Sequence, residues 1–197
     1  MSLRRTAILG AVATCLHLAL SPSATSQELD TSSWADSSAL ARLEGAYRYA
    51  GTPAEDHAKI DASVQAAVSS LGWLGRKVAS SRLANHKELP ERILIARRGD
   101  DVSITMGKYD AVAALDGSPK ELVAPNGRDA KLSYRVTRDE ILQFFVFEHA
   151  KRQSTYRLDG EGRLVMSVFM TSEKLASPIA YELVYETDDQ AERGTRS

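Results

Sequence analysis

The second half of the chain is built from short segments in which apolar and polar residues alternate. The alternation is clear at Val102, Ile104 and Met106, where a polar residue separates each apolar residue from the next. Because successive side chains of a β-strand point to opposite faces, this pattern is typical of strands with one buried face. Turn dipeptides such as Asn126-Gly127 separate the segments. The pattern predicts about ten strands, in an all-β barrel or sandwich.

An earlier segment, residues 43–49, shows the same alternation, and a helical stretch follows it. Thr52-Pro53-Ala54-Glu55 offers an N-cap hydroxyl, a proline at the first helical position and a glutamate at the capping-box position. The residues behind it place one apolar face on a helix, and they are Ile60, Val64, Ala67, Val68 and Leu71. A second, shorter helix is expected beyond a glycine-rich bend, with Leu74, Val78 and Leu83 facing inward and Asn85 near its end. A helix pair is therefore predicted between strands one and two.

The N-terminus predicts export. Arg4 and Arg5 precede an apolar run, Ala7–Leu20, which ends before small residues at 24–26. This is the pattern of a cleaved signal peptide, although an uncleaved membrane anchor is the alternative. We therefore expect a signal peptide (1–26), a flexible leader (27–41), the β-barrel domain (42–186) and a disordered tail (187–197). The mature protein is expected in the periplasm or secreted.

Charge and cysteine content restrict the partners of the mature chain. The full sequence has 25 basic and 26 acidic residues, and removal of Arg4 and Arg5 with the signal gives the mature chain a net charge of 25 − 2 − 26 = −3. This near balance gives no electrostatic basis for binding nucleic acid. The single cysteine, Cys15, lies in the predicted signal, so no internal disulfide is expected after cleavage. Beyond the signal no apolar run approaches membrane-spanning length, and no membrane span is expected in the mature chain.

The order of the predicted elements resembles that of the calycins, the lipocalin and fatty-acid-binding-protein architecture. In that architecture a helix pair covers a ten-stranded, antiparallel up-and-down β-barrel. Gly45-Ala46-Tyr47 is similar to the Gly-x-Trp signature on the first strand of lipocalins, with Tyr47 in place of the tryptophan. The resemblance covers residues 43–186 and extends to uncharacterised exported bacterial proteins of the same layout. It implies a ligand held inside the barrel.

One departure from the family concerns the ligand. Fatty-acid-binding proteins carry an arginine and a tyrosine on their closing strands that hold the ligand carboxylate. Here the predicted last strand contains Tyr181 and Tyr185 but no arginine. The ligand class of the family therefore does not carry over to this chain.

Neither metal chemistry nor nucleophilic catalysis is indicated. His57, His86 and His149 do not form a cluster with the spacing of zinc ligands. No serine lies in a Gly-x-Ser-x-Gly elbow, and the paired carboxylates fall in predicted turns or the tail. We therefore expect a protein that is not an enzyme and has no metal or other cofactor.

Two functional hypotheses remain. The first is an exported binding protein for a small apolar or amphipathic molecule inside the barrel. The second is a non-catalytic envelope domain that binds another protein and has a filled barrel, which exposed apolar residues around Trp73-Leu74 would favour. For the first hypothesis, the predicted ligand-binding residues supply an apolar wall and phenolic donors. They are Tyr47, Phe145, Phe147, Met166, Tyr181 and Tyr185.

Overall fold

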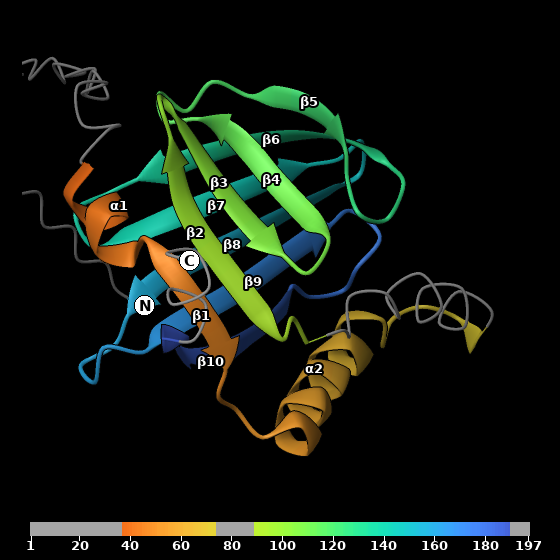
Figure 1. Ribbon diagram of the computed structural model, residues 1–197. Helices are drawn as coiled ribbons and strands as arrows, with labels where there is room; N and C mark the ends of the chain where they lie inside the picture. The colour runs from red at the N-terminus through yellow and green to blue at the C-terminus, as the bar shows by residue number, and fades with distance from the viewer. Residues whose placement is uncertain (1–36, 74–88, 190–197) are drawn as a thin grey trace, which may run out of the picture. The chain divides into compact units, whose positions relative to one another are not determined.

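The computed structural model describes residues 37–73 and 89–189. Helix α1 (Ser37–Leu43) precedes strand β1 (Gly45–Tyr49), and helix α2 (Pro53–Ala67) follows it (Figure 1). The other strands follow in chain order: β2 (Arg92–Arg98), β3 (Asp101–Met106), β4 (Tyr109–Ala114), β5 (Lys120–Val123), β6 (Asp129–Val136), β7 (Glu140–Val146), β8 (Ala150–Leu158), β9 (Leu164–Ser172) and β10 (Ile179–Thr187).

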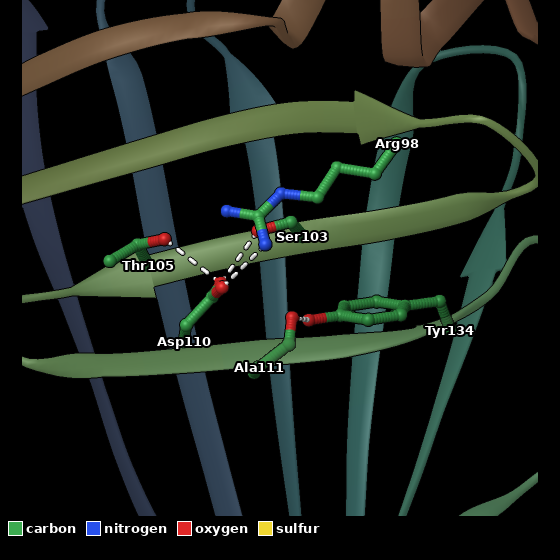
Figure 2. A network of polar contacts seen from close by, with 6 residues as sticks. All are labelled: Arg98, Ser103, Thr105, Asp110, Ala111 and Tyr134. Carbon is green, nitrogen blue, oxygen red and sulfur yellow. Dashed lines mark hydrogen bonds and ion pairs between the residues drawn. The ribbon is translucent and has the colours of Figure 1, made fainter.

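The ten strands form one antiparallel sheet in the order β4-β3-β2-β1-β10-β9-β8-β7-β6-β5. Strands that are consecutive in the chain are neighbours except β4 and β5, and β1 also pairs with β10, which curls the meander into a nearly closed barrel. The predicted mainly β, up-and-down barrel of ten strands is therefore confirmed. Strands β4 and β5 are the two edges of the sheet. Across this opening the Tyr134 hydroxyl on β6 donates a hydrogen bond of 2.8 Å to the Ala111 carbonyl on β4 (Figure 2).

The alternation in the sequence determines which side chains fill the barrel. On β6, Leu132, Tyr134 and Val136 point inward and are buried, whereas Lys131 and Arg135 are exposed. Each large apolar side chain removed from water contributes about 1.5–3 kcal/mol, so a register shift by one residue would expose the whole set.

Glycines with a positive φ make the turns between these strands. Gly99 (φ +65°) lies between β2 and β3, and Gly127 (φ +73°) between β5 and β6. Residues with a Cβ rarely adopt this conformation, which explains why the predicted turns contain glycine.

Helix α1 occupies residues that the sequence predicted as leader and first strand. Ala39 and Leu40 of the predicted leader (27–41) are buried in the main core, and Leu43 ends α1 instead of opening β1. The Arg42 guanidinium donates hydrogen bonds to the Asp139 carboxylate (3.1 Å) and to a carbonyl in the β6–β7 turn. The folded domain thus begins before residue 42, and α1 packs at the end of the barrel that holds this turn.

Helix α2 lies between β1 and β2, as predicted, and packs on the start of β10. Ile60, Val64 and Ala67 form a separate small core with Met170 and Ile179. Pro53 begins the helix as expected, but the predicted side-chain cap at residue 52 makes no hydrogen bond. The second predicted helix, residues 74–83, lies outside the described residues.

The start of α2 is tied to the end of β1 by a buried carboxylate. Asp56 is 6% exposed and accepts hydrogen bonds from the Tyr49 hydroxyl (2.7 Å) and the Lys59 ammonium (2.9 Å). A Cβ at Gly51 would clash with both the Asp56 carboxylate and the Tyr49 hydroxyl. The chain therefore needs glycine at this corner, because the two groups meet against its backbone.

Val146 is 40% exposed on the outer face of β7, so the apolar run of residues 141–147 does not form a strand that is buried on both faces. The predicted disordered tail (187–197) begins too early. Thr187 belongs to β10, and Asp188 is buried and forms an ion pair of 2.9 Å with Arg92. Residues 1–36 and 190–197, including the predicted signal peptide, lie outside the described residues.

Candidate functional site

A chain of three buried polar side chains crosses the inside of the barrel wall. Strand register places Tyr134 opposite Gln143, and the Gln143 amide nitrogen donates to the Tyr134 hydroxyl at 2.8 Å. The Tyr156 hydroxyl on β8 donates to the Gln143 carbonyl oxygen at 3.1 Å. All three side chains are at most 1% exposed. Tyr134 also donates to a β4 carbonyl, so the network links β4, β6, β7 and β8. The buried polar groups of these three side chains are hydrogen-bonded to one another or to that carbonyl.

Other polar atoms inside the barrel have no partner among the described residues. The hydroxyl oxygens of Tyr109 and Tyr185 and the Nε of Arg152 are buried and make no hydrogen bond. A buried donor without an acceptor costs about 1–3 kcal/mol, and more when it is charged. These atoms are therefore donors that are available to a group which the described residues do not supply.

Arg152 is the most unusual of these residues because it carries a charge. On β8 it follows the same alternation as Tyr156, which turns both side chains toward the interior. Its cross-strand neighbours are Phe145 on β7 and Met170 on β9. Among the described residues, no carboxylate forms an ion pair with its guanidinium. An inward-facing cation with no anion among the described residues is costly, which makes Arg152 a candidate functional residue.

The pKa shifts of the interior tyrosines agree with an Arg152 side chain that faces the interior of the barrel. Burial raises the pKa of Tyr109, Tyr181 and Tyr185, and the positive charge of Arg152 acts in the opposite direction on each of them. Burial likewise raises the pKa of Tyr156 to about 12. At neutral pH these tyrosines therefore keep their protons and present hydroxyl groups around Arg152.

The two ends of the barrel differ in what covers them. Near α2 lie Arg152 and its neighbour Met170, which packs against that helix. Toward α1 the interior is filled by large side chains that are at most 1% exposed, among them Leu40, Val136 and Ile141.

The six predicted ligand-binding residues all lie on the inner side of the wall, but they do not form one cluster. Phe145 and Phe147 stack with ring centroids 6.3 Å apart, and Tyr109 packs on Phe145 at the same separation. Met166 and Tyr185 are buried in the main core, and Tyr181 is partly buried against it. Tyr47 lies at the α1 end, where its hydroxyl donates to the Leu43 carbonyl at 3.0 Å.

Sequence reasoning missed Arg152 and Tyr109. The search for an arginine was confined to the last strand, whereas Arg152 lies two strands away on β8. A signal was present, because Arg152, Tyr156 and Leu158 share one parity. The neighbours of Tyr109 come from β7, which only the closure of the barrel brings near.

A second polar cluster lies on the outer face of the sheet (Figure 2). Asp110 accepts hydrogen bonds from Ser103 (2.6 Å), Thr105 (3.0 Å) and Arg98 (2.8 Å). Burial raises the pKa of Asp110, but these hydrogen bonds outweigh burial and lower it. Because the carboxylate is fully used in joining β2, β3 and β4, this cluster is a structural tie.

The described residues show no metal centre. Within 37–73 and 89–189, no three histidine, cysteine, aspartate or glutamate side chains are arranged to hold a metal ion. In the same ranges no helix has the length and apolar character needed to cross a membrane.

Comparison with solved structures finds barrels of similar fold at low identity. The chain is similar to apo Caenorhabditis elegans lipid binding protein 8, with 13% identity and a TM-score of 0.46, over 75% of this chain and 96% of that one. It is also similar to wild-type fluorescent protein UnaG, with 10% identity and a TM-score of 0.47, over 76% and 99%.

A third similar structure is zebrafish ileal bile acid-binding protein complexed with cholic acid, with 13% identity and a TM-score of 0.47, over 75% and 99%. No protein-family model matches the sequence, and no curated protein matches it. All three TM-scores lie below 0.5, so these similarities carry no argument about function.

Proposed function

We propose that this chain is a non-catalytic binding protein that holds a small amphipathic molecule inside the barrel. The observation that carries this proposal is Arg152, an inward-facing guanidinium with no carboxylate partner among the described residues and with a buried, unbonded Nε. The molecule that fits this arrangement has an apolar body and an acidic group.

The energetics favour an acidic group over a neutral one. Hydrogen bonds to a charged group contribute about 1.5–3 kcal/mol, roughly twice the value for neutral pairs. The guanidinium also recovers part of the cost of leaving water only when it meets an anion. The Tyr109 hydroxyl lies in the electrostatic range of Arg152 and is itself unbonded, so it is a second donor for the same group.

The apolar body would contact the wall around this charge. Phe145 and Phe147 provide stacked rings beside Arg152, and Met166 and Met170 line β9 on the inner side. Methionine side chains adapt to irregular ligand shapes, and aromatic rings give large apolar contact area. This combination is typical of a site for a lipid-like molecule rather than for a sugar or a nucleotide.

We also propose that the protein works outside the cytoplasm, in the periplasm or after secretion. The support is the sequence pattern of residues 1–26, with Arg4 and Arg5 before an apolar run. Expression of the full chain followed by intact-mass measurement of the exported protein tests this. Loss of about the first 26 residues supports export, and an intact N-terminus in the cytoplasm contradicts it.

The binding proposal is tested with dodecanoic acid as probe, by isothermal titration of the purified protein. We expect one site, and Arg152→Met should weaken binding by about tenfold or more, because a charged hydrogen-bonded contact is lost. Arg48→Met is the matched control, since Arg48 lies on the outer face, where it pairs with Glu186. Absence of binding by the wild type, or an equal effect of both substitutions, would contradict the proposal.

Exposed apolar residues favour the protein-interaction alternative as a second candidate. Phe169 is 46% exposed on the outer face of β9, Val146 is 40% exposed on β7, and Trp73 is 73% exposed. Leu74, which the sequence grouped with Trp73, lies outside the described residues. If the barrel ignores dodecanoic acid and Phe169→Ser abolishes association with a partner in envelope extracts, the interaction domain becomes the better account.

A further inference from the structure

The unbonded donors inside the barrel come from three separate parts of its wall. The Tyr109 hydroxyl belongs to β4, the Arg152 Nε and the Ser154 hydroxyl belong to β8, and the Tyr185 hydroxyl belongs to β10. These strands are not neighbours in the sheet, because β9 lies between β8 and β10, and β1, β2 and β3 lie between β10 and β4. A group that meets all of these donors is therefore approached from several directions.

Arg152 connects these donors into one cluster. Tyr109 packs on the ring of Phe145, the cross-strand neighbour of Arg152, with ring centroids 6.3 Å apart. Ser154 lies two residues further along β8, so its side chain points to the same face of the strand as that of Arg152. Burial raises the pKa of Tyr109 and Tyr185, and the positive charge of Arg152 acts on both hydroxyls in the opposite direction. The neutral donors therefore lie within the electrostatic range of one interior cation or beside it on the same strand.

The charge of this cluster matches that of a monoanion. Arg152 supplies one positive charge, and the hydroxyls of Tyr109 and Tyr185 stay protonated because burial raises their pKa. In the part of the chain that the structure describes, no carboxylate forms an ion pair with the guanidinium. A phosphate monoester carries a charge of about −1.5 to −2 at pH 7, so part of its charge would stay unbalanced in the interior.

The directions of the donors favour a tetrahedral head over a planar one. A carboxylate accepts hydrogen bonds close to its own plane, as sp² oxygens do in general. Its two oxygens are well matched to donors that lie in that plane, such as a guanidinium. A sulfonate or a sulfate monoester has three terminal oxygens that point in three directions and carries one negative charge. Such a head can face β4, β8 and β10 at the same time.

We infer that the ligand carries a tetrahedral, monoanionic head, a sulfonate or a sulfate monoester, which Arg152 holds together with Tyr109, Ser154 and Tyr185. This inference rests on the proposed function and names the chemical class of its acidic group. A carboxylate would meet Arg152 and Tyr109 and would leave the Tyr185 hydroxyl unbonded. The third oxygen of the tetrahedral head would accept a hydrogen bond from Tyr185.

The test compares dodecanoic acid with undecane-1-sulfonate by isothermal titration of the purified protein, because both probes carry the same undecyl chain. On the wild type we expect the sulfonate to bind about two- to tenfold more tightly, the effect of one additional neutral hydrogen bond. Tyr185→Phe should reduce this preference by the same factor, and Arg152→Met should weaken both probes. The change in the affinity ratio is decisive, since the difference in hydration between the two heads is the same for every variant and cancels.

Tyr134→Phe is the matched control, because it also removes one phenolic hydroxyl from the interior. The Tyr134 hydroxyl is already bonded to Ala111 and Gln143, so its loss should leave the affinity ratio of the two probes unchanged. Melting of the free protein gives a second readout. Because the Tyr185 hydroxyl has no partner, Tyr185→Phe should leave the melting temperature unchanged or raise it, whereas Tyr134→Phe should lower it. A fall for Tyr185→Phe would overturn the inference, since the hydroxyl would then be satisfied inside the protein.

The remaining outcomes separate this inference from the proposed function. If dodecanoic acid binds through Arg152 and the sulfonate binds no more tightly, the binding function stands and the tetrahedral head is wrong. If Tyr185→Phe weakens both probes by the same factor, this hydroxyl does not distinguish the two heads, and the inference is wrong as well. If neither probe binds, the proposed function itself fails.

Discussion

The buried network of Tyr134, Gln143 and Tyr156 allows a quantitative test of the barrel interior. Gln143→Leu preserves the size of the side chain but removes both of its hydrogen bonds, those of 2.8 Å to Tyr134 and 3.1 Å to Tyr156. Tyr134 keeps its bond to the β4 carbonyl, whereas Tyr156 loses its acceptor. A buried hydroxyl without its partner costs about 1–3 kcal/mol. The apolar leucine offsets part of this cost, so we expect a net loss of about 1–2 kcal/mol.

The assay is urea unfolding at neutral pH, with equal m-values as the condition for comparing variants. Gln153→Leu is a suitable control, because Gln153 lies on the same wall but faces outward on β8 and bonds only Thr155. Tyr156→Phe completes a double-mutant cycle with Gln143→Leu. Since the two residues share one bond, the double variant should be more stable than additivity predicts, by about 0.5–3 kcal/mol. Additivity within about 0.5 kcal/mol would refute the network.

Three further predictions concern the elements around the site. Asp56→Asn should cost about 1–3 kcal/mol near neutral pH. Burial raises the pKa of Asp56, but hydrogen bonds, including that from Lys59, outweigh it and hold the pKa below the ordinary 3.8. This stabilisation is therefore present above pH 3.8 and lost as the pH falls through the lower pKa of the folded state. The difference in unfolding free energy between the wild type and Asp56→Asn, measured in urea, should therefore shrink as the pH is lowered below 3.8. Tyr134→Phe should accelerate amide hydrogen exchange in β4, because the Ala111 carbonyl loses its link across the opening; unchanged exchange would mean that the edge is held otherwise. Leu40→Ala should destabilise the barrel by about 2–5 kcal/mol in thermal unfolding, and a loss under 1 kcal/mol would show that α1 is not part of the core.

The strands could be predicted from the sequence because their pattern is local. Val102, Ile104 and Met106 alternate with polar residues regardless of what they pack against, and glycine at 99 and 127 marks turns by its backbone freedom alone. Helix α1 could not be predicted in this way. It is seven residues long and follows a serine-rich stretch, so its formation depends on burying Ala39 and Leu40 against distant strands.

The candidate site was only partly predictable for a related reason. Parity on a strand indicates which side chains face inward, and this suffices for Phe145, Met166 and Tyr185. Whether an inward polar atom finds a partner depends on residues from strands far apart in the sequence. Tyr134 and Tyr109 show the difference, since the hydroxyl of Tyr134 is fully bonded and that of Tyr109 is not. No pattern along one strand separates these two cases.

The most direct test of the central claim is a crystal structure of the protein with dodecanoic acid. The account predicts density for the acid inside the barrel, with its carboxylate at hydrogen-bonding distance, about 2.7–2.9 Å, from the Arg152 guanidinium. Density for the acid only on the outer face, or an interior filled by side chains with Arg152 paired to a carboxylate of the protein itself, would contradict it.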